Sequence, residues 1–190
     1  NGIMVFSGDF EGLTLADGER IEKRVSEVSL TMPFDTFIGY YKVHGSGSKT
    51  AVIFGVDENI SSFMNMEILS GRLFNKFECE SGEKVCVVEE SFAMSEFQRT
   101  NIVGKTVFLS DGSSGDNYTI VGVVKSSVSD ITGLIGVKIP QFIYVPYESL
   151  GYGEDASIGQ LAIKVKNEKD AAEVKSKVIS VLKKSNIRGK

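Results

Sequence analysis

Alternation of apolar and polar positions predicts strands near both ends of the chain. Val28, Leu30 and Met32 alternate with polar residues, and this period of two is typical of a strand with one buried face. The same period recurs over residues 158–165, where Leu161, Ile163 and Val165 lie on one face. The pattern therefore predicts a half-buried strand in each terminal region.

A period near 3.6 residues predicts a helix beside each of these strands. Ile21 and Val25 lie four residues apart and share one helical face, and Asp17 is the expected N-cap of that short helix. Towards the end of the chain a longer helix is expected over residues 168–184, with Asn167 as its cap. Its apolar stripe, which would pack on a sheet, comprises Ala171, Val174, Val178 and Val181.

Residues 36–44 and 49–56 are rich in strand-forming side chains and are separated by the turn sequence Gly-Ser-Gly-Ser. This arrangement predicts a β-hairpin. A short helical or irregular link over residues 61–66 follows.

The middle of the chain reads as a series of short elements. A helix over residues 90–98 would bury Phe92, Ala93 and Phe97, and the Ser- and Gly-rich stretch 126–138 is expected to be a loop. Strands are expected over residues 84–88, 105–109, 118–125 and 141–145, with Pro146 ending the last of them.

Helices and strands that are mixed in this way indicate an α+β fold. We expect the two ends of the chain, residues 1–60 and 155–190, to form one layer. Residues 61–154 would then be a second, smaller α/β subdomain that is inserted between them.

Composition excludes some classes of function. The 190 residues are 42% hydrophobic and carry a formal net charge of −4, which argues against nucleic-acid binding because phosphate contacts need clustered Lys and Arg. There is no run of 18 apolar residues, so nothing in the sequence is expected to span a bilayer. A small basic cluster at the end is either a solvated helix end or a segment close to a membrane surface; it comprises Lys183, Lys184, Arg188 and Lys190.

The two cysteines leave two alternatives open. Cys79 and Cys86 could form a disulfide that closes a short loop across Gly82. Alternatively Cys86, within an apolar run, is a free and buried thiol. Two cysteines without a nearby histidine do not make a zinc site.

Candidate catalytic residues are few. The single histidine, His44, stands beside the expected hairpin turn without a partner that would tune it. The run from Gly45 to Thr50 superficially resembles a phosphate-binding loop, but Val43 and Ser48 occupy positions where that motif needs glycine, and a strand rather than a helix should follow.

The acidic groups fit solvated turns better than a metal or catalytic site. None has the spacing of a calcium loop or an obvious partner for acid–base work, and the groups are Asp57/Glu58, Glu78/Glu80/Glu83 and Asp111/Asp116. We therefore expect no catalytic, metal or cofactor site, and a protein that is not an enzyme. Arg72 either ties a loop to a carboxylate or to backbone carbonyls, or is an exposed charge.

The order of the motifs resembles the extracytoplasmic core domain of ABC-transporter permeases of the MacB/FtsX type. The resemblance covers residues 13–182, nearly the whole chain, and each piece alone is unspecific. Its pieces are the run from Leu13 to Pro33, Phe54-Gly-Val-Asp57, Leu69-Ser-Gly-Arg-Leu-Phe74 with a "GR-x-F" segment, Lys84 to Val88, Asn101 to Val107, Tyr118 to Val124 and Phe142 to Pro146.

This resemblance implies a non-enzymatic domain on the outer side of the cell membrane, extracellular or periplasmic, with a porter-like part built from the chain ends. It implies as partners a second permease subunit, met through membrane spans, and a cytoplasmic ATPase, with an adaptor protein or a peptide substrate as a further partner. ATP hydrolysis would be coupled to movement or gating of a substrate outside the membrane. The alternatives are a ligand-sensing module and a secreted hydrolase. Exposed apolar residues at 131–139 would support the ligand-sensing module.

Overall fold

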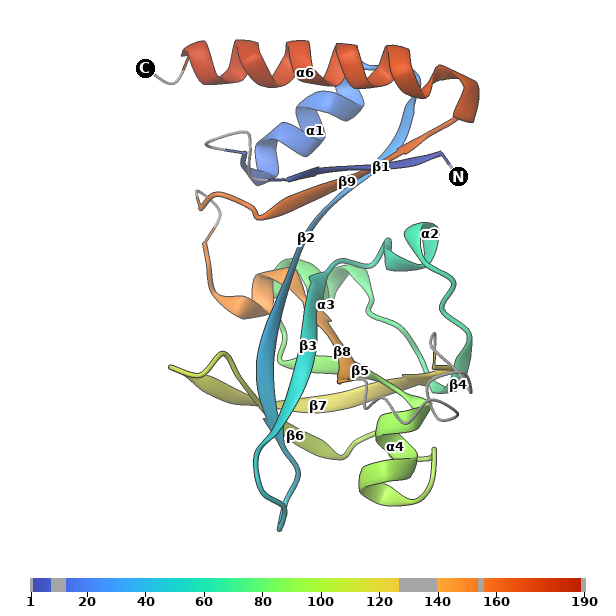
Figure 1. Cartoon of the computed structure of the whole chain (residues 1–190), viewed down its shortest axis with the longest axis vertical. Coiled ribbons are helices and arrows are strands. Elements are labelled where there is room, and N and C mark those ends of the chain that lie inside the picture. The colour runs from blue at the N-terminus through green and yellow to red at the C-terminus, as the bar shows by residue number, and fades with distance from the viewer. Residues whose placement is uncertain (1, 8–12, 127–139, 154–155, 189–190) are drawn as a thin grey trace. The chain divides into compact units, whose positions relative to one another are not determined.

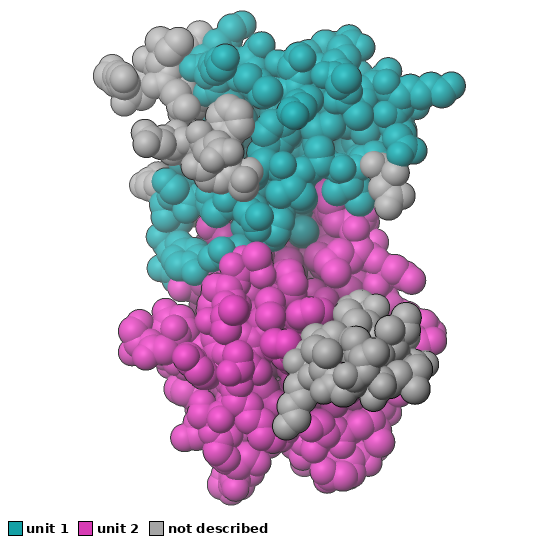
Figure 2. Space-filling view, in the orientation of Figure 1, with its two compact units in different colours: residues 1–35, 151–190 teal, residues 36–150 magenta. Residues whose placement is uncertain are grey.

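The computed structural model describes residues 2–7, 13–126, 140–153 and 156–188, and no side chains beyond residue 184. The chain divides into two compact units (Figure 2). Unit 1 comprises residues 1–35 and 151–190, and unit 2 comprises residues 36–150. Segments from both ends of the chain therefore belong to unit 1. The division lies at residues 35/36, earlier than the expected 60/61, because the expected hairpin pairs with strands of the middle block.

Unit 1 is a three-stranded antiparallel sheet with two helices. Strand β9 (Gln160–Val165) lies between β1 (Ile3–Ser7) and the first half of β2 (Val28–Lys42). Helices α1 (Leu15–Arg24) and α6 (Ala171–Arg188) contact each other and lie on the same side of β1 and β9 (Figure 1). The sheet therefore joins a strand from the start of the chain to one near its end.

The core of unit 1 confirms the predicted helical and strand patterns. Most of their apolar positions are buried, notably Ile21, Val25, Val28, Leu161, Ile163, Val174 and Val178. One exception is Leu30, which is only partly buried while the polar Thr31 is buried, next to a shift in strand register between Val28 and Leu30. Gly18 lets α1 approach the sheet, since a Cβ there would lie 2.9 Å from the Thr31 hydroxyl oxygen. Apolar burial of this kind is the main stabilising contribution in a small α/β layer.

The helix caps match the prediction at one end of the chain and differ at the other. Asn167 accepts a hydrogen bond from the Lys169 amide and caps the 3₁₀ turn η2 (Glu168–Asp170) that leads into α6. The N-cap of α1 is Thr14, so the prediction that Asp17 is the N-cap was wrong. Asp17 occupies the third helical position, where its carboxylate accepts from the Thr14 amide at 2.8 Å in a capping box.

Unit 2 is built on a ring of strands. The second half of β2 is followed around the ring by β3 (Lys49–Val56), β8 (Gln141–Pro146), β5 (Val85–Glu89), β7 (Gly115–Val124) and β6 (Thr106–Ser110), which pairs with β2 again. The predicted hairpin is present, with β2 and β3 joined by a turn in which the Ser46 amide donates to the Val43 carbonyl. Closing the ladder removes free strand edges.

The inward-facing residues of the ring form one apolar core with helix α4 (Glu90–Phe97). As predicted, α4 buries Phe92 and Ala93 completely, and Phe97 packs against the cluster. Ring residues in this core include Tyr41, Ile53, Cys86, Leu109, Tyr118, Ile120 and Ile143.

Several short elements were not predicted, or only loosely. Strand β1 and strand β4 (Ile68–Gly71), which pairs with β7, were missed, as were α3 (Lys76–Ser81) and the 3₁₀ turn η1 (Tyr147–Leu150). Helix α2 (Ile60–Phe63) falls near the expected link. The loop expected at 126–138 lies outside the described residues except for Ser126.

Candidate functional site

Sequence reasoning offered few groups for chemistry, and the structure keeps these groups apart. His44 is exposed next to the β2–β3 turn. Asp111 accepts bonds from the amides of Ser113 and Ser114 within its own turn, and these bonds lower the pKa of its carboxyl. In the described parts of the chain, no three His, Cys, Asp or Glu side chains lie close enough together to hold a metal ion.

The remaining acidic groups serve local structure. Asp116 pairs with Lys84 at 3.4 Å and Glu80 with Lys76 at 3.7 Å, both on the surface. An Asp57 oxygen accepts from the Asn59 amide at 2.8 Å, where β3 ends.

Cys79 and Cys86 are free, buried thiols, which corresponds to the second of the two alternatives above. Burial raises the pKa of Cys79 to about 12, with a further contribution from the nearby Glu58, and burial alone raises the pKa of Cys86. A nucleophilic cysteine needs a lowered pKa, so neither thiol is suited to covalent catalysis.

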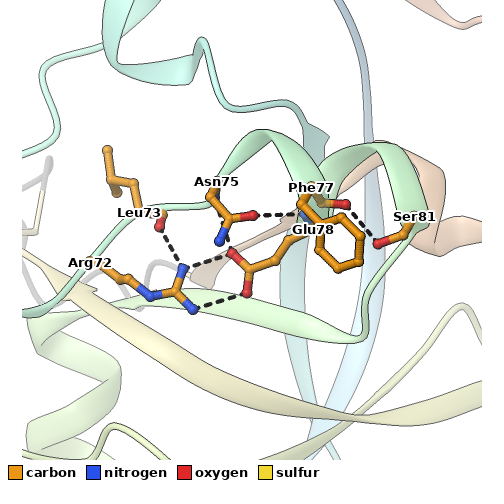
Figure 3. Close-up of polar contacts among 6 residues, drawn as sticks. All are labelled: Arg72, Leu73, Asn75, Phe77, Glu78 and Ser81. Carbon is orange, nitrogen blue, oxygen red and sulfur yellow. Dashed lines mark hydrogen bonds and ion pairs between the residues drawn. The ribbon is translucent and has the colours of Figure 1, made fainter.

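A bidentate ion pair joins Arg72 to Glu78 beside strand β4 (Figure 3). The two guanidinium nitrogens of Arg72 donate to the two carboxylate oxygens of Glu78 at 2.7 and 3.0 Å, and one of them also donates to the Leu73 carbonyl. The tie proposed for Arg72 is therefore present, although its side chain is 53% exposed while that of Glu78 is 10% exposed. The hydrogen bonds from Arg72 lower the pKa of Glu78.

Glu78 also closes a capping box at the start of α3. Its amide donates to the Asn75 side chain at 2.8 Å, and its carboxylate accepts from the Asn75 amide at 3.0 Å. One carboxylate thus fastens both the helix start and the preceding strand. Sequence reasoning found the arginine but not this partner.

The backbone just before Arg72 is tightly packed. Gly71 has φ +70°, and a Cβ there would lie 2.1 Å from the Val121 carbonyl oxygen. Only glycine fits such a position. The Gly-Arg sequence therefore combines a close strand approach with the ion pair that follows it.

A second tie in unit 2 was missed by sequence reasoning. The Glu96 carboxylate, on α4, accepts from the Tyr41 hydroxyl at 2.9 Å and from the Lys49 ammonium at 2.7 Å. Burial and the adjacent Glu96 raise the pKa of Tyr41. No local pattern could have paired residues so distant in the sequence.

In unit 1 an exposed network ties α6 to the start of β2. The Lys177 ammonium lies 2.6 Å from a Glu27 oxygen and 3.1 Å from a Glu173 oxygen. The hydrogen bond from Lys177 lowers the pKa of Glu27, and the hydrogen bonds to Glu27 and Glu173 raise the pKa of Lys177. The second Glu27 oxygen is buried without a partner among the described residues.

Taken together, the described residues provide rigid ties and apolar cores, with no assembled reaction centre. No described helix is both long and apolar enough to cross a membrane.

Comparison with known proteins identifies the class. The family model of the MacB-like periplasmic core domain matches residues 1–181, so the chain belongs to this family. It is an extracytoplasmic domain of the kind found in ABC transporter permeases.

Individual relatives agree with this assignment. The chain is 25% identical over 100 residues to the uncharacterized ABC transporter permease YknZ of Bacillus subtilis, a match covering 53% of this chain and 23% of the relative. The chain thus spans less than a quarter of the length of the curated relative that it matches.

Solved structures show the same fold. The periplasmic region of MacB from Actinobacillus actinomycetemcomitans superposes with a TM-score of 0.75 at 21% identity, covering 99% of this chain and 84% of that one. The extracellular domain of YknZ from Gram-positive bacteria also gives 0.75, at 14% identity, covering 97% and 92%. A domain of a Porphyromonas gingivalis permease gives 0.65 at 11% identity, covering 92% and 72%. The α+β fold expected from the sequence is thereby confirmed.

Proposed function

We propose that this domain is a non-enzymatic moving part of an ABC exporter, which couples ATP hydrolysis in the cytoplasm to movement or gating of a substrate outside the membrane. One observation carries the proposal. Both terminal elements of the described chain, β1 and α6, belong to unit 1, while residues 36–150 form a separate unit.

This arrangement suits a domain that is held by its ends. If membrane helices precede and follow it, unit 1 is the porter-like part to which their displacement is applied. Unit 2 then moves with unit 1, because the chain connects the two units at residues 35/36 and 150/151. The partners in this proposal are a second permease subunit, met through membrane spans, and a cytoplasmic ATPase. An adaptor protein or a peptide substrate would meet the outer surface.

The ties described above support the same role. Each unit must keep its own shape if displacement of one is to move the other, and buried cores with bidentate or multiply bonded ion pairs resist local opening. Arg72–Glu78 fastens α3 to the end of β4, and Tyr41–Glu96–Lys49 fastens α4 to β2 and β3.

Distance measurement in the full permease tests the proposal. Nitroxide labels at Lys23→Cys in unit 1 and Lys105→Cys in unit 2 would report the separation of the units with and without hydrolysable ATP. Both positions are exposed, whereas the native thiols are buried and should not take up the label.

The expected result is a distance distribution that changes between nucleotide states. A control pair within unit 2, Lys76→Cys with Lys105→Cys, should give the same distance in every state. If transport proceeds while the distance between the units stays constant, or if a permease without residues 36–150 still exports its substrate, the coupling role is wrong.

A further inference from the structure

An open pocket of about 470 Å³ lies on the outer surface of the ring in unit 2. Its walls come from the end of β2, the β2–β3 turn and strands β6 and β7, and they are formed by Lys42, Val43, His44, Gly45, Ser46, Thr106, Phe108 and Asn117. A volume in this range accommodates a small molecule or a few residues of peptide.

Strand register explains why these side chains meet. Lys42 on β2 is paired with Phe108 on β6, and Phe108 is paired with Asn117 on β7. Paired residues on adjacent antiparallel strands point to the same face, so Lys42 and Asn117 flank Phe108 in one row about 10 Å wide. Their sequence neighbours Tyr41, Val107 and Tyr118 point into the core.

A glycine helps to shape the floor of this pocket. A Cβ at Gly115 would lie 2.6 Å from the Phe108 ring, so the absence of a side chain there lets the ring lie close to the neighbouring strand. Thr106 stands two residues before Phe108 on β6 and therefore lies on the same face, while His44 borders the pocket from the turn that follows β2.

The only charged side chain among the described lining residues is the positive Lys42. No acidic side chain lines it, and among the described residues Lys42 makes no ion pair, whereas Lys49, Lys84, Lys125 and Lys177 all do. The hydroxyl of Thr106, the amide of Asn117 and the imidazole of His44 add hydrogen-bonding groups. Phe108 offers apolar surface beside them, whereas Val43 borders the pocket but is buried in the core of the ring.

We propose that this pocket binds a carboxylate carried next to an apolar group, as in an acidic peptide segment with neighbouring hydrophobic side chains. A single ammonium matches a single negative charge, while the aromatic floor accepts an adjacent apolar side chain. A phosphate is less well matched because the pocket lacks arginine. This inference does not depend on the coupling role proposed above.

Titration of the ¹⁵N-labelled 190-residue chain tests the proposal. The probe is acetyl-Phe-Glu-Phe-amide, and its matched partner carries Gln in place of Glu. We expect shift changes confined to residues 42–46, 106–108 and 117, and at least about tenfold weaker binding of the Gln peptide, since a hydrogen bond between charged groups contributes roughly that factor. Phenylacetate is titrated in parallel to distinguish a free small carboxylate from a peptide-borne one.

Two variants make the test specific. Lys42→Gln should weaken the Glu peptide about tenfold, and Asn117→Asp should abolish its binding by placing a like charge in the pocket. Lys23→Gln, in unit 1, makes the same change in net charge and should have no effect. The proposal would be overturned if Lys23→Gln and Lys42→Gln weakened binding of the Glu peptide equally, or if the Glu and Gln peptides bound equally well. It would also be overturned if inorganic phosphate displaced the Glu peptide more effectively than phenylacetate does.

Discussion

The two units differ in how the chain closes them. Unit 2 uses one continuous stretch, residues 36–150, and its strands close into a ring around a single core. Unit 1 is completed only when strands from opposite ends of the chain pair, as Phe6 does with Leu161. The described core of unit 2 therefore forms within one continuous stretch of chain, whereas unit 1 depends on both ends of the chain arriving together.

This difference suits a domain that is held at one unit and carries the other. The unit that receives the chain ends is the one that any adjoining segments would displace. The self-contained unit can be moved without having to re-form. If the units behave as separate bodies, a change in one should leave the other intact.

Thiol labelling should report the opening of unit 2 alone, because both cysteines lie there. Cys86 is completely buried, so its reaction with a disulfide reagent at pH 8 should be at least about a thousandfold slower in the folded chain than in urea. The measurement is the labelling rate followed by mass spectrometry. Labelling of Cys86 at the unfolded rate would contradict the described core.

Core truncation should affect each unit separately. Phe92→Ala in unit 2 should cost about 3–5 kcal/mol and Ile163→Ala in unit 1 about 2–5 kcal/mol, since both side chains are fully buried. Hydrogen exchange should then rise mainly in the unit that carries the substitution. Phe77→Ala, at a side chain that is 70% exposed, serves as the control and should change stability by less than about 0.5 kcal/mol. Equal loss of protection in both units would show that they unfold as one.

Breaking the Arg72–Glu78 pair should have a moderate effect that depends on pH. Glu78→Gln removes the charge that Arg72 and the Asn75 amide share, and should cost about 1–2 kcal/mol near pH 7. Because the folded-state pKa of Glu78 is lowered, its contribution is complete above the ordinary carboxyl pKa and is lost as the pH falls through the lowered value.

Urea unfolding between pH 7 and pH 3 measures this contribution. The wild type and Glu78→Gln should converge at the acidic end, and Arg72→Lys should fall between them at neutral pH because it keeps the charge but loses the bidentate geometry. A stability difference that stays constant across this range would exclude the charged pair as its cause.

The Lys177 network in unit 1 should have the smallest effect. Lys177→Gln removes an exposed ion pair with Glu27 and should lower the unfolding midpoint only slightly at low salt. At 1 M salt, where the screening length is about 3 Å, variant and wild type should coincide. A large loss that persists in salt would instead point to the buried Glu27 oxygen as an important group.

Local patterns predicted much of this fold. The strand at 28–32, most of the strand at 158–165, the hairpin around Gly45, α4 and the stripe of α6 were predicted correctly because each depends on spacing within a single segment. The buried face of the first strand was wrong at Leu30, because a shift in register beside it buries Thr31 instead. Strand β4 and helix α3 were missed, since each is only a few residues long and is held by partners elsewhere. Of the candidate chemistry, the sequence identified Arg72 as a tie but could not identify Glu78 as its partner.

The sequence by itself determined the α+β class, the apolar faces of the main helices and strands, and the family resemblance, because these follow from the order and period of residue types. Only the tertiary structure decided that β6 closes a ring between β2 and β7, that the domain divides at residues 35/36, and that Lys42, Phe108 and Asn117 share one face. Those features depend on pairing between segments far apart in the chain, which no local pattern encodes.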